Sequence, residues 1–344
     1  MSSELRKLVE KRDLTSDEAF YIASSIMKGE LPDALVAGIL IALRMKGETP
    51  DEIASFVRSM RSFMIKAEGS PNSIDTAGTG GDGMNTVNVS TASAIAVSSV
   101  VPVFKHGNRA VSSSSGSADV LEAFGYDINV KPEEVSPLVR KTNFVFLFAQ
   151  LYHPAMRNVA PIRKTLGVRT LFNVLGPFTN PASVKRQVIG VFSKDYMNVL
   201  IETAKILNYE KIILVHGEPG IDEVSVSGKT FVKILDHGKV LSEEFVPEDF
   251  GASIIDLNKL RTSSAEESAI RILRSSLGKD REVSSFIRAN IAMDLLLIEK
   301  VKNLRDGYEM ADSLLSELPS RAKQIISSHG NERKLQELLD KARG

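Results

Sequence analysis

The chain has 344 residues, 43% of them hydrophobic and 25% charged, which is ordinary for a globular protein with a large core and enough length for two domains. Basic and acidic residues number 43 each, which argues against a nucleic-acid-coating protein, and the absence of cysteine excludes disulfides, thiolate catalysis and thiolate metal sites. Without a signal peptide or an apolar run of about eighteen residues, we expect a cytoplasmic protein with no membrane contact.

Residues 1–66 are predicted to be helical. Thr15-x-x-Glu18 and Thr49-Pro50-Asp51-Glu52 are capping-box patterns, the second with proline at the first helical position. Between them, the segment from Leu35 to Met45 is strongly apolar. A helix of this kind buries its aliphatic surface in an internal bundle or against a second subunit, and its sequence leaves both open.

A glycine loop follows the turn-rich residues 70–73. Residues 73–75 end a predicted strand, and residues 77–83, Ala-Gly-Thr-Gly-Gly-Asp-Gly, are predicted to form a sharply bent loop. Its glycines permit positive φ and let a ligand approach bare amides. The next apolar run, residues 87–100, carries polar side chains at its start, namely Asn88, Ser90 and Thr91. Free N–H groups and the helix dipole favour an anion there.

A second loop of similar composition follows. Residues 101–104 are predicted to form a strand, Lys105-His106-Gly107-Asn108-Arg109 leaves its end, and a serine-rich loop over residues 112–117 leads into a helix over residues 118–124. Two strand ends that each deliver a glycine and hydroxyl loop onto a helix predict a phosphate pocket at the carboxyl edge of a parallel sheet.

Two nucleotide-binding motifs are excluded. Gly78-x-Gly80-x-x-Gly83 fits the dinucleotide fingerprint as a pattern, but that fingerprint needs an acid about twenty residues further on, where this chain has Phe104 and Lys105. No Gly-x-x-x-x-Gly-Lys-Ser/Thr motif is present, so a P-loop is also excluded.

The middle of the chain alternates strands and helices. Residues 144–148 are predicted to form a buried parallel strand, and residues 156–171 a basic helix of the kind that is usually a solvated face. Strands over residues 188–192 and 211–215 with a helix over 195–207 between them predict a doubly wound sheet.

Two adjacent carboxylates, Asp222 and Glu223, follow the last of these strands on a glycine and proline loop. Such residues are most often surface charge. At the carboxyl end of a strand, facing the predicted phosphate loops, they suit Mg²⁺, which is usually held by one or two carboxylates plus substrate phosphates. The remaining residues are predicted to be mostly amphipathic helix without chemistry of their own.

These motifs, in this order, resemble the anthranilate phosphoribosyltransferase family. The resemblance is carried by Asp75-Thr76-x-Gly78-Thr79-Gly80-Gly81-Asp82, Thr86 to Thr91, Lys105 to Arg109, Ser113 to Ser117, Asp119 to Glu122, Arg169-Thr170-x-Phe172-Asn173-x-Leu175-Gly176-Pro177, Asn180-Pro181 and Asp222-Glu223. It covers nearly the whole chain.

The resemblance implies an α/β fold with a small all-helical domain and a larger α/β domain whose central sheet is mostly parallel and covered by helices. The helical domain is expected over residues 1–66, with 158–187 packing on it, and the phosphoribosyl-binding domain over 67–157 and 188–344. It also implies a homodimer through the helical domain, and transfer of a 5-phosphoribosyl group from phosphoribosyl pyrophosphate to anthranilate with one or two Mg²⁺ ions, in tryptophan biosynthesis.

The site residues implied by the resemblance fall into three groups. Phosphoribosyl pyrophosphate is expected to contact Gly78, Gly81, Asp82, Thr86, Asn88, Val89, Ser90, Thr91, Lys105, His106, Gly107, Asn108, Arg109, Ala110, Val111, Ser112, Ser113 and Ser117. Anthranilate is expected to contact Gly78, His106, Asn108, His153, Arg163 and Pro177. The metal ligands are expected to be Ser90, Asp222 and Glu223. Arg163 is the expected clamp for the anthranilate carboxylate, which suits the two parallel bonds of an arginine fork.

No side chain is assigned as a catalytic acid or base. Asp82 has two readings of equal weight, a ligand of the sugar diphosphate or a cap that holds the glycine turn. His106 is not needed as a general base because the attacking aniline nitrogen is already neutral at pH 7, so a packing or hydrogen-bonding role is expected.

Two alternative functions fit this sequence less well than phosphoribosyl transfer. Pyrimidine nucleoside phosphorylases are similar in fold and share a lysine-histidine-glycine loop, but they are longer and typically have glycine where this chain has Asn108. Some related proteins of this fold bind nucleic acid, which predicts a strongly basic surface and decayed metal and anthranilate motifs. The neutral charge, Asp222-Glu223 and Arg163 argue against that role.

Overall fold

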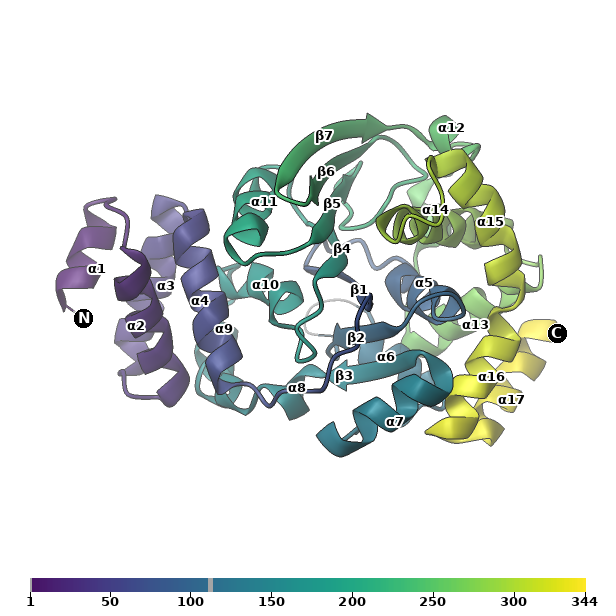
Figure 1. The fold of residues 1–344 in the computed structure, drawn as a ribbon, viewed down its shortest axis with the longest axis horizontal. Coiled ribbons are helices and arrows are strands. Elements are labelled where there is room, and N and C mark those ends of the chain that lie inside the picture. The colour runs from purple at the N-terminus through teal and green to yellow at the C-terminus, as the bar shows by residue number, and fades with distance from the viewer. Residues whose placement is uncertain (1, 111–113) are drawn as a thin grey trace.

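The computed structural model describes residues 2–110 and 114–344, which form a helical part at the N-terminus and a larger α/β part (Figure 1). This confirms the expected fold class. The first part contains α1 (Ser2–Val9), α2 (Ser16–Lys28), α3 (Asp33–Lys46) and α4 (Pro50–Phe63). The strands are β1 (Ile74–Gly78), β2 (Val103–Gly107), β3 (Phe144–Phe148), β4 (Arg186–Gly190), β5 (Lys211–Gly217), β6 (Thr230–Asp236) and β7 (Lys239–Phe245).

The other helical segments lie between and after the strands. Those before β5 are α5 (Val89–Val97), α6 (Ser117–Phe124), α7 (Pro132–Thr142), α8 (Ala149–Tyr152), η1 (Pro154–Asn158), α9 (Ala160–Leu166), α10 (Phe172–Leu175), η2 (Gly176–Thr179) and α11 (Tyr196–Ile206). Those after β7 are α12 (Pro247–Phe250), η3 (Leu257–Leu260), α13 (Ala265–Ser276), α14 (Arg281–Leu297), α15 (Leu304–Ser316), α16 (Leu318–Ser328) and α17 (Glu332–Arg343).

Both predicted capping boxes are present in the helical part. The Thr15 and Thr49 side chains accept from the amides of Glu18 and Glu52. The carboxylate of each glutamate in turn accepts from the amide of its cap residue. The apolar helix α3 is covered only in part, since Met45 at its end is 75% exposed.

The helical part shares one hydrophobic cluster with later segments of the chain. Val159 and Ile162, close to and within α9, and Phe172 of α10 are buried with the cores of α2 and α4, and the cluster continues onto the β4–β5 face of the sheet. Figure 1 shows α9 and α10 between the N-terminal helices and the sheet. Among the described residues, no helix has the length and apolarity needed to cross a membrane.

The sheet has the order β3-β2-β1-β4-β5-β6-β7, and its first five strands are parallel. From β1 the chain moves outward to β2 and β3 on one side, and from β4 it moves outward to β5, β6 and β7 on the other. The change of direction between β1 and β4 is a topological switch point, and ligands bind at the carboxyl ends of the strands on either side of such a point.

The predicted strand boundaries need three corrections. β1 continues through Ala77 and Gly78, because Gly78 pairs with Gly190 of β4, so the loop begins at Thr79. β2 includes Lys105, His106 and Gly107, which pair with β3 instead of leaving the sheet. The antiparallel hairpin β6–β7 was missed, because β7 has no buried residue and mixes polar and apolar side chains on both faces, so it shows no apolar alternation.

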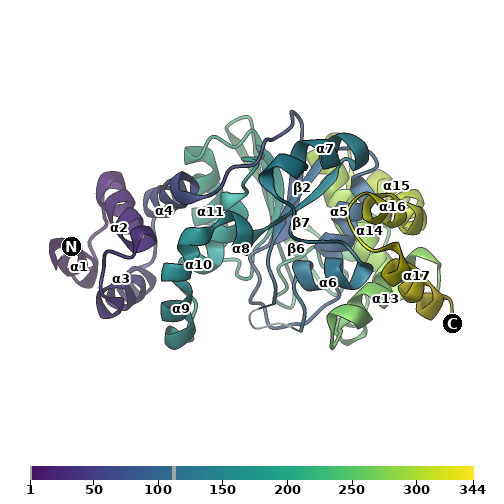
Figure 2. The ribbon, with the colours of Figure 1, turned by 90° about the horizontal axis from the view of Figure 1, so that it is seen from below.

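The predicted basic helix over residues 156–171 was also wrong in extent. The segment is divided into η1 and the short helix α9, which ends at Gly167 with a φ of 62°. The C-terminal helices α13 to α17 cover the side of the sheet away from the N-terminal helices, with α14 packed on α5 (Figures 1 and 2).

Candidate active site

Hydrogen bonds at the switch point join the first glycine loop, residues 79–83, to the loop that carries Asp222 and Glu223, which we call the acidic loop. The amide of Gly80 donates to Asp222 Oδ2 over 2.6 Å, and the Thr86 hydroxyl donates to Glu223 Oε2 over 2.9 Å. Gly80, Gly81 and Gly83 have φ values of 69°, 80° and 75°, which only glycine adopts at little cost. The two loops therefore form one wall at the carboxyl edge of the sheet.

Close approach explains two glycines at this edge. A Cβ atom on Gly78 would overlap Asp222 Oδ2, and one on Gly190 would overlap the Asp222 carbonyl oxygen. These neighbours on β1 and β4 leave the space that the acidic loop occupies. Gly78 therefore has a steric role in this wall of the site, and its contact with substrate stays a prediction.

Asp222 and Glu223 carry more negative charge than their surroundings neutralise. Burial, and then the charge of Asp82, raise the pKa of Asp222 to about 7, while burial and the neighbouring acids raise the pKa of Glu223 well above its usual range. A divalent cation would relieve this cost. Among the described residues no group of three or more His, Cys, Asp or Glu side chains is arranged to hold a metal alone. Two carboxylates, Asp222 and Glu223, are a donor set that fits Mg²⁺, because this ion completes its coordination shell with water and phosphate oxygens.

Asp82 has the geometry of a loop cap. Its Oδ1 accepts from the amide of Met84 over 3.0 Å, which closes the turn of the glycine loop. Its charge also raises the pKa of Asp222, so Asp82 lies close to the acidic pair. The cap reading thus has direct support, and a contact with sugar diphosphate stays a prediction.

The start of α5 and the end of β2 meet behind these loops. The buried Lys105, 1% exposed, donates from Nζ to the Thr76 carbonyl over 2.8 Å and to Ser90 Oγ over 3.3 Å. Burial lowers the pKa of Lys105, and the charges of Asp75, Asp294 and Glu223 oppose this. Lys105 and Ser90 therefore lie together on the side of the site that the acidic pair faces.

The predicted residues Asn88, Val89 and Thr91 are also at the start of α5. Asn88 occupies the N-cap position, but its side chain bonds to Ser115 of the second loop instead of capping the helix, with Ser115 Oγ donating to Asn88 Oδ1 over 2.7 Å. Val89 and Thr91 are buried, and the Thr91 hydroxyl has no hydrogen-bond partner among the described residues. The amides of Val89 and Thr91 donate to the carbonyls of Val87 and Asn88, so among the described residues the Ser90 amide is the one at this helix end that stays available for an anion.

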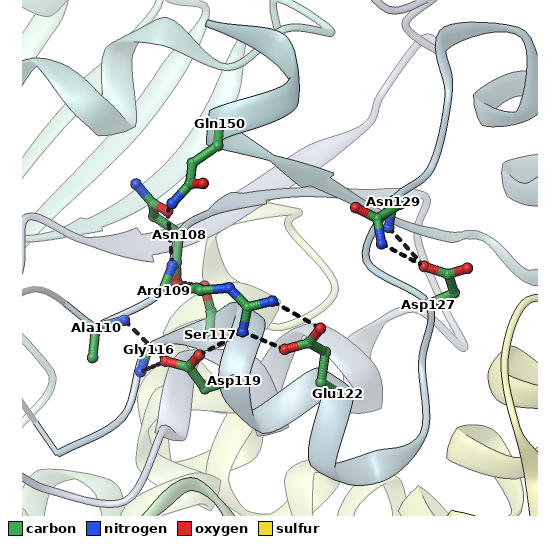
Figure 3. Close-up of polar contacts among 10 residues, drawn as sticks. All are labelled: Asn108, Arg109, Ala110, Gly116, Ser117, Asp119, Glu122, Asp127, Asn129 and Gln150. Carbon is green, nitrogen blue, oxygen red and sulfur yellow. Dashed lines mark hydrogen bonds and ion pairs between the residues drawn. The ribbon is translucent and has the colours of Figure 1, made fainter. Parts of the chain in front are cut away.

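The second loop is held by one acid, Asp119 (Figure 3). Its Oδ2 accepts from the amides of Ala110 and Gly116, each over 2.9 Å, and its Oδ1 accepts from Arg109 over 3.0 Å. Arg109 also forms a forked ion pair with Glu122. Its guanidinium is therefore engaged by carboxylates, and its predicted contact with sugar diphosphate stays a prediction.

Gly107, Asn108 and Ser117 complete the second loop. A Cβ atom on Gly107 would overlap Ser117 Oγ, so the glycine lets the strand end approach α6. The Asn108 carbonyl accepts from the amide of Ala118 over 3.2 Å, and Gln150 reaches its side chain (Figure 3). The predicted ligands Val111, Ser112 and Ser113 lie outside the described residues.

Two buried histidines lie ring to ring beside this loop. The centroids of His106 and His153 are 5.1 Å apart, and the Nε2 atom of each has no hydrogen-bond partner among the described residues. Burial and the neighbouring His153 lower the pKa of His106 well below its usual value, and burial lowers the pKa of His153 to about 4. Both rings are neutral at pH 7, and the expectation that His106 is not a base stays a prediction.

Arg163 is a half-buried cation without a counter-ion. Its guanidinium lies over the Phe172 ring at 5.7 Å and makes no hydrogen bond or ion pair within residues 2–110 and 114–344. Burial lowers its pKa. Pro177 is buried in η2, and its carbonyl accepts from Gln187 over 2.8 Å. An unpaired guanidinium of this kind can bind a carboxylate with two parallel bonds.

The predictions omitted Arg169 as a site residue. Its guanidinium donates to the carbonyl of Gly81 in the first loop and lies over the Phe192 ring at 4.4 Å. Arg169 lies just after α9, so this contact ties that segment to the glycine loop. Its place at the start of the Arg-Thr-x-Phe-Asn motif was the available signal.

Known families match both parts of the chain. Residues 3–64 match the helical bundle domain of a glycosyl transferase family, and residues 70–317 match the a/b domain of that family. Anthranilate phosphoribosyltransferase of Saccharolobus islandicus is 56% identical over 340 residues, covering 99% of this chain and 98% of the relative. The enzyme of the same name from Sulfolobus acidocaldarius is 49% identical, covering 97% and 98%.

The chain belongs to the anthranilate phosphoribosyltransferase family.

Solved anthranilate phosphoribosyltransferases share its fold. The Thermus thermophilus structure superposes with a TM-score of 0.83 at 34% identity and covers 99% of both chains. A Saccharomyces cerevisiae structure in complex with PRPP and Mg gives 0.82 at 28% identity, covering 98% of this chain and 97% of that one. The yeast enzyme in complex with 4-fluoroanthranilate gives 0.82 at 26% identity, covering 100% and 98%.

Proposed function

We propose that this protein transfers the 5-phosphoribosyl group from phosphoribosyl pyrophosphate to the amine of anthranilate, giving N-(5-phosphoribosyl)anthranilate and pyrophosphate, a step of tryptophan biosynthesis. The hydrogen-bonded wall of the glycine loop and Asp222-Glu223 carries the proposal, because it places a glycine-rich backbone and uncompensated buried carboxylates at one sheet edge. Relatives at 49–56% identity over nearly the full chain support it.

The chain's part in this reaction is charge and position. The bond from the anomeric carbon to the diphosphate oxygen breaks, the bonding electrons leave with pyrophosphate, and the sugar gains oxocarbenium character. Lys105 and the amides of the glycine loop and the start of α5 bind the phosphates and stabilise the charge that develops on them. The hydroxyls of Ser90, Thr91 and Ser117 orient the sugar diphosphate.

Anthranilate is held by Arg163 through its carboxylate. Gly78, His106, Asn108, His153 and Pro177 line the space around the aromatic ring in this proposal. The amine attacks the anomeric carbon with its lone pair, and the attack needs no base because the nitrogen is neutral beforehand. The secondary ammonium formed in this step then loses its proton to water or to the departing pyrophosphate. The low pKa values of His106 and His153 keep positive charge away from the aromatic ring.

Ser90, Asp222 and Glu223 are the proposed Mg²⁺ ligands, and one or two ions are proposed. When bound, Mg²⁺ supplies positive charge that neutralises the diphosphate leaving group. Mg in the yeast complex with PRPP supports this choice.

We also propose a homodimer through the helical part. Support comes from exposed apolar side chains of α1, α2 and α3, where Val9, Tyr21 and Met45 are 69%, 57% and 75% exposed. Sedimentation of wild type against Met45→Lys tests it, because a charge in an apolar interface should shift a dimer toward monomer.

The cytoplasmic location stays a prediction.

The proposed reaction is tested by pyrophosphate release. Purified protein with phosphoribosyl pyrophosphate and Mg²⁺ should release pyrophosphate only when anthranilate is added, in equal amount to the anthranilate consumed. Release without anthranilate, or phosphorolysis of pyrimidine nucleosides in its place, would overturn the assignment in favour of hydrolysis or nucleoside phosphorolysis.

A further inference from the structure

One face of α14 contacts the back of the proposed site. Asn290 pairs with the backbone of Val224, the residue after Glu223: its Oδ1 accepts from the Val224 amide over 3.0 Å, and its Nδ2 donates to the Val224 carbonyl over 3.2 Å. Nδ2 also donates to the Phe286 carbonyl over 3.0 Å, which fixes the side chain against its own helix. Two bonds from one side-chain amide therefore hold the acidic loop to α14.

Asp294 lies one turn further along the same face. It is completely buried, and its Oδ2 accepts from the hydroxyl of Ser93 in α5, the helix whose first turn carries Ser90 and Thr91. Its Oδ1 has no hydrogen-bond partner among the described residues. Burial raises the pKa of Asp294 to about 7, while Ser93, Thr76 and Lys105 lower it, so its carboxylate lies close to the lysine.

This carboxylate matters for Lys105 because it is one of three acids, with Asp75 and Glu223, whose charge opposes the cost of burying the lysine. Lys105 bonds to one carbonyl and one hydroxyl, and a buried ammonium is stable only beside negative charge. Asp75 gives the largest of these charges, but it also accepts from Asn180 over 2.8 Å, from Gln187 over 3.1 Å and from the His106 amide over 3.3 Å. Asp294 adds to this charge with an Oδ1 that accepts no hydrogen bond among the described residues.

We propose that Asn290 and Asp294 are positioning residues for the reaction: Asn290 sets the acidic loop that holds the metal, and Asp294 sets Lys105 and the start of α5 for the sugar diphosphate. The inference rests on the proposed function of that site. Helix α14 thereby takes part in the reaction, although its residues neither contact substrate in the proposal nor belong to the loops at the sheet edge.

The two residues should have separable effects on direct binding. In Asp294→Asn, which keeps an acceptor for Ser93 but removes the charge, the dissociation constant for phosphoribosyl pyrophosphate measured by calorimetry should rise about tenfold. In Asn290→Ala, the dissociation constant for Mn²⁺, read by electron paramagnetic resonance in the presence of phosphoribosyl pyrophosphate, should rise about tenfold.

The matched control is Asp280→Asn on the same helix. Asp280 caps α14 by accepting from the Val283 amide and pairs with Arg271, so its change disturbs the helix without reaching the site. Both of its dissociation constants should equal those of wild type. Ser93→Ala removes the donor to Asp294 from the other side, and its weaker binding of phosphoribosyl pyrophosphate would support the proposal even if an α14 variant does not fold.

Two outcomes separate the proposals. Wild type that turns over anthranilate, with Asp294→Asn, Asn290→Ala and Ser93→Ala all binding as the control does, would overturn the positioning role alone. Wild type that binds neither phosphoribosyl pyrophosphate nor Mn²⁺ would overturn the function on which it rests.

Discussion

The amide of Gly80 donates to Asp222 Oδ2 over 2.6 Å, which joins residues 142 positions apart into one wall of the site. This bond lies at the carboxyl ends of the neighbouring strands β1 and β4, from which the chain continues in opposite directions along the sheet. The glycine loop is thereby shaped by the acidic loop before any ligand arrives. The loop amides that Asp222 does not engage are thereby preorganised, and such amides bind an anion without a further cost of ordering.

The first prediction concerns Gly78. A methyl group there would overlap Asp222 Oδ2, so Gly78→Ala should displace the acidic loop and lower kcat/KM at least about a hundredfold, while the free energy of unfolding falls by about 1–3 kcal/mol. Steady-state kinetics and denaturant unfolding measure both. The control is Gly38→Ala in α3, where a Cβ meets only ordinary contacts from Leu5 and helix propensity improves. Equal activity in the two variants would contradict the steric account.

Asp119 is expected to hold the second loop. Asp119→Ala removes the acceptor for two amides and an ion pair of Arg109, and it should lower the free energy of unfolding by about 1–3 kcal/mol and raise KM for phosphoribosyl pyrophosphate. Burial raises the pKa of Asp119, but these bonds outweigh it and leave the pKa below its usual value.

Asp127 in the same view is the control for Asp119 (Figure 3). Among the described residues its carboxylate accepts from the amide and side chain of Asn129 alone, so Asp127→Ala should leave KM unchanged. If Asp119→Ala kept the wild-type KM, the loop's order would not depend on this carboxylate.

The pH dependence of stability has a definite sign at Asp294. Its pKa is raised from 3.8 in the unfolded chain to about 7, so between these values the folded state binds more protons. Wild type should therefore lose stability relative to Asp294→Asn as pH rises from 4 to 7, by up to about 4 kcal/mol, and the difference should level off above that. Thermal unfolding of both proteins over this range checks it; a difference that grows in favour of wild type would contradict it.

The two facing histidines should stay neutral across the physiological range. Proton NMR of the ring hydrogens should show His153 titrating near pH 4 and His106 below its usual range, while replacement of each histidine in turn assigns the signals. A ring of either residue that titrates between pH 6 and 7 would restore His106 or His153 as a candidate proton acceptor.

Local chemistry explains what could be predicted from the sequence. The glycine loops, the capping boxes and the acidic pair are contiguous runs whose residue types allow few conformations, and β3 is a continuous apolar strand. Strand ends were less accurate, because Gly78 and Gly107 read as loop residues although they are paired within the sheet.

The contribution of α14 could not be predicted in the same way. Asn290 lies 66 positions from Val224, and Asp294 lies 201 positions from Ser93, so no local pattern links them. On an amphipathic helix, a polar residue among apolar ones gives no sign of its partner. Arg163 could also not be recognised from its local sequence, because a basic segment is typical of solvated surface. The structure instead leaves its guanidinium half-buried and unpaired among the described residues.

The most direct test follows the fluorescence of anthranilate as it is consumed with phosphoribosyl pyrophosphate and Mg²⁺, in wild type, Arg163→Ala and the control Lys164→Ala, which alters the exposed neighbour. Wild type and Lys164→Ala should turn over alike, and Arg163→Ala should show a KM for anthranilate about a hundredfold higher with little change in KM for phosphoribosyl pyrophosphate. Loss of fluorescence at equal rates in all three would contradict the carboxylate clamp, and no loss in wild type would contradict the proposed reaction.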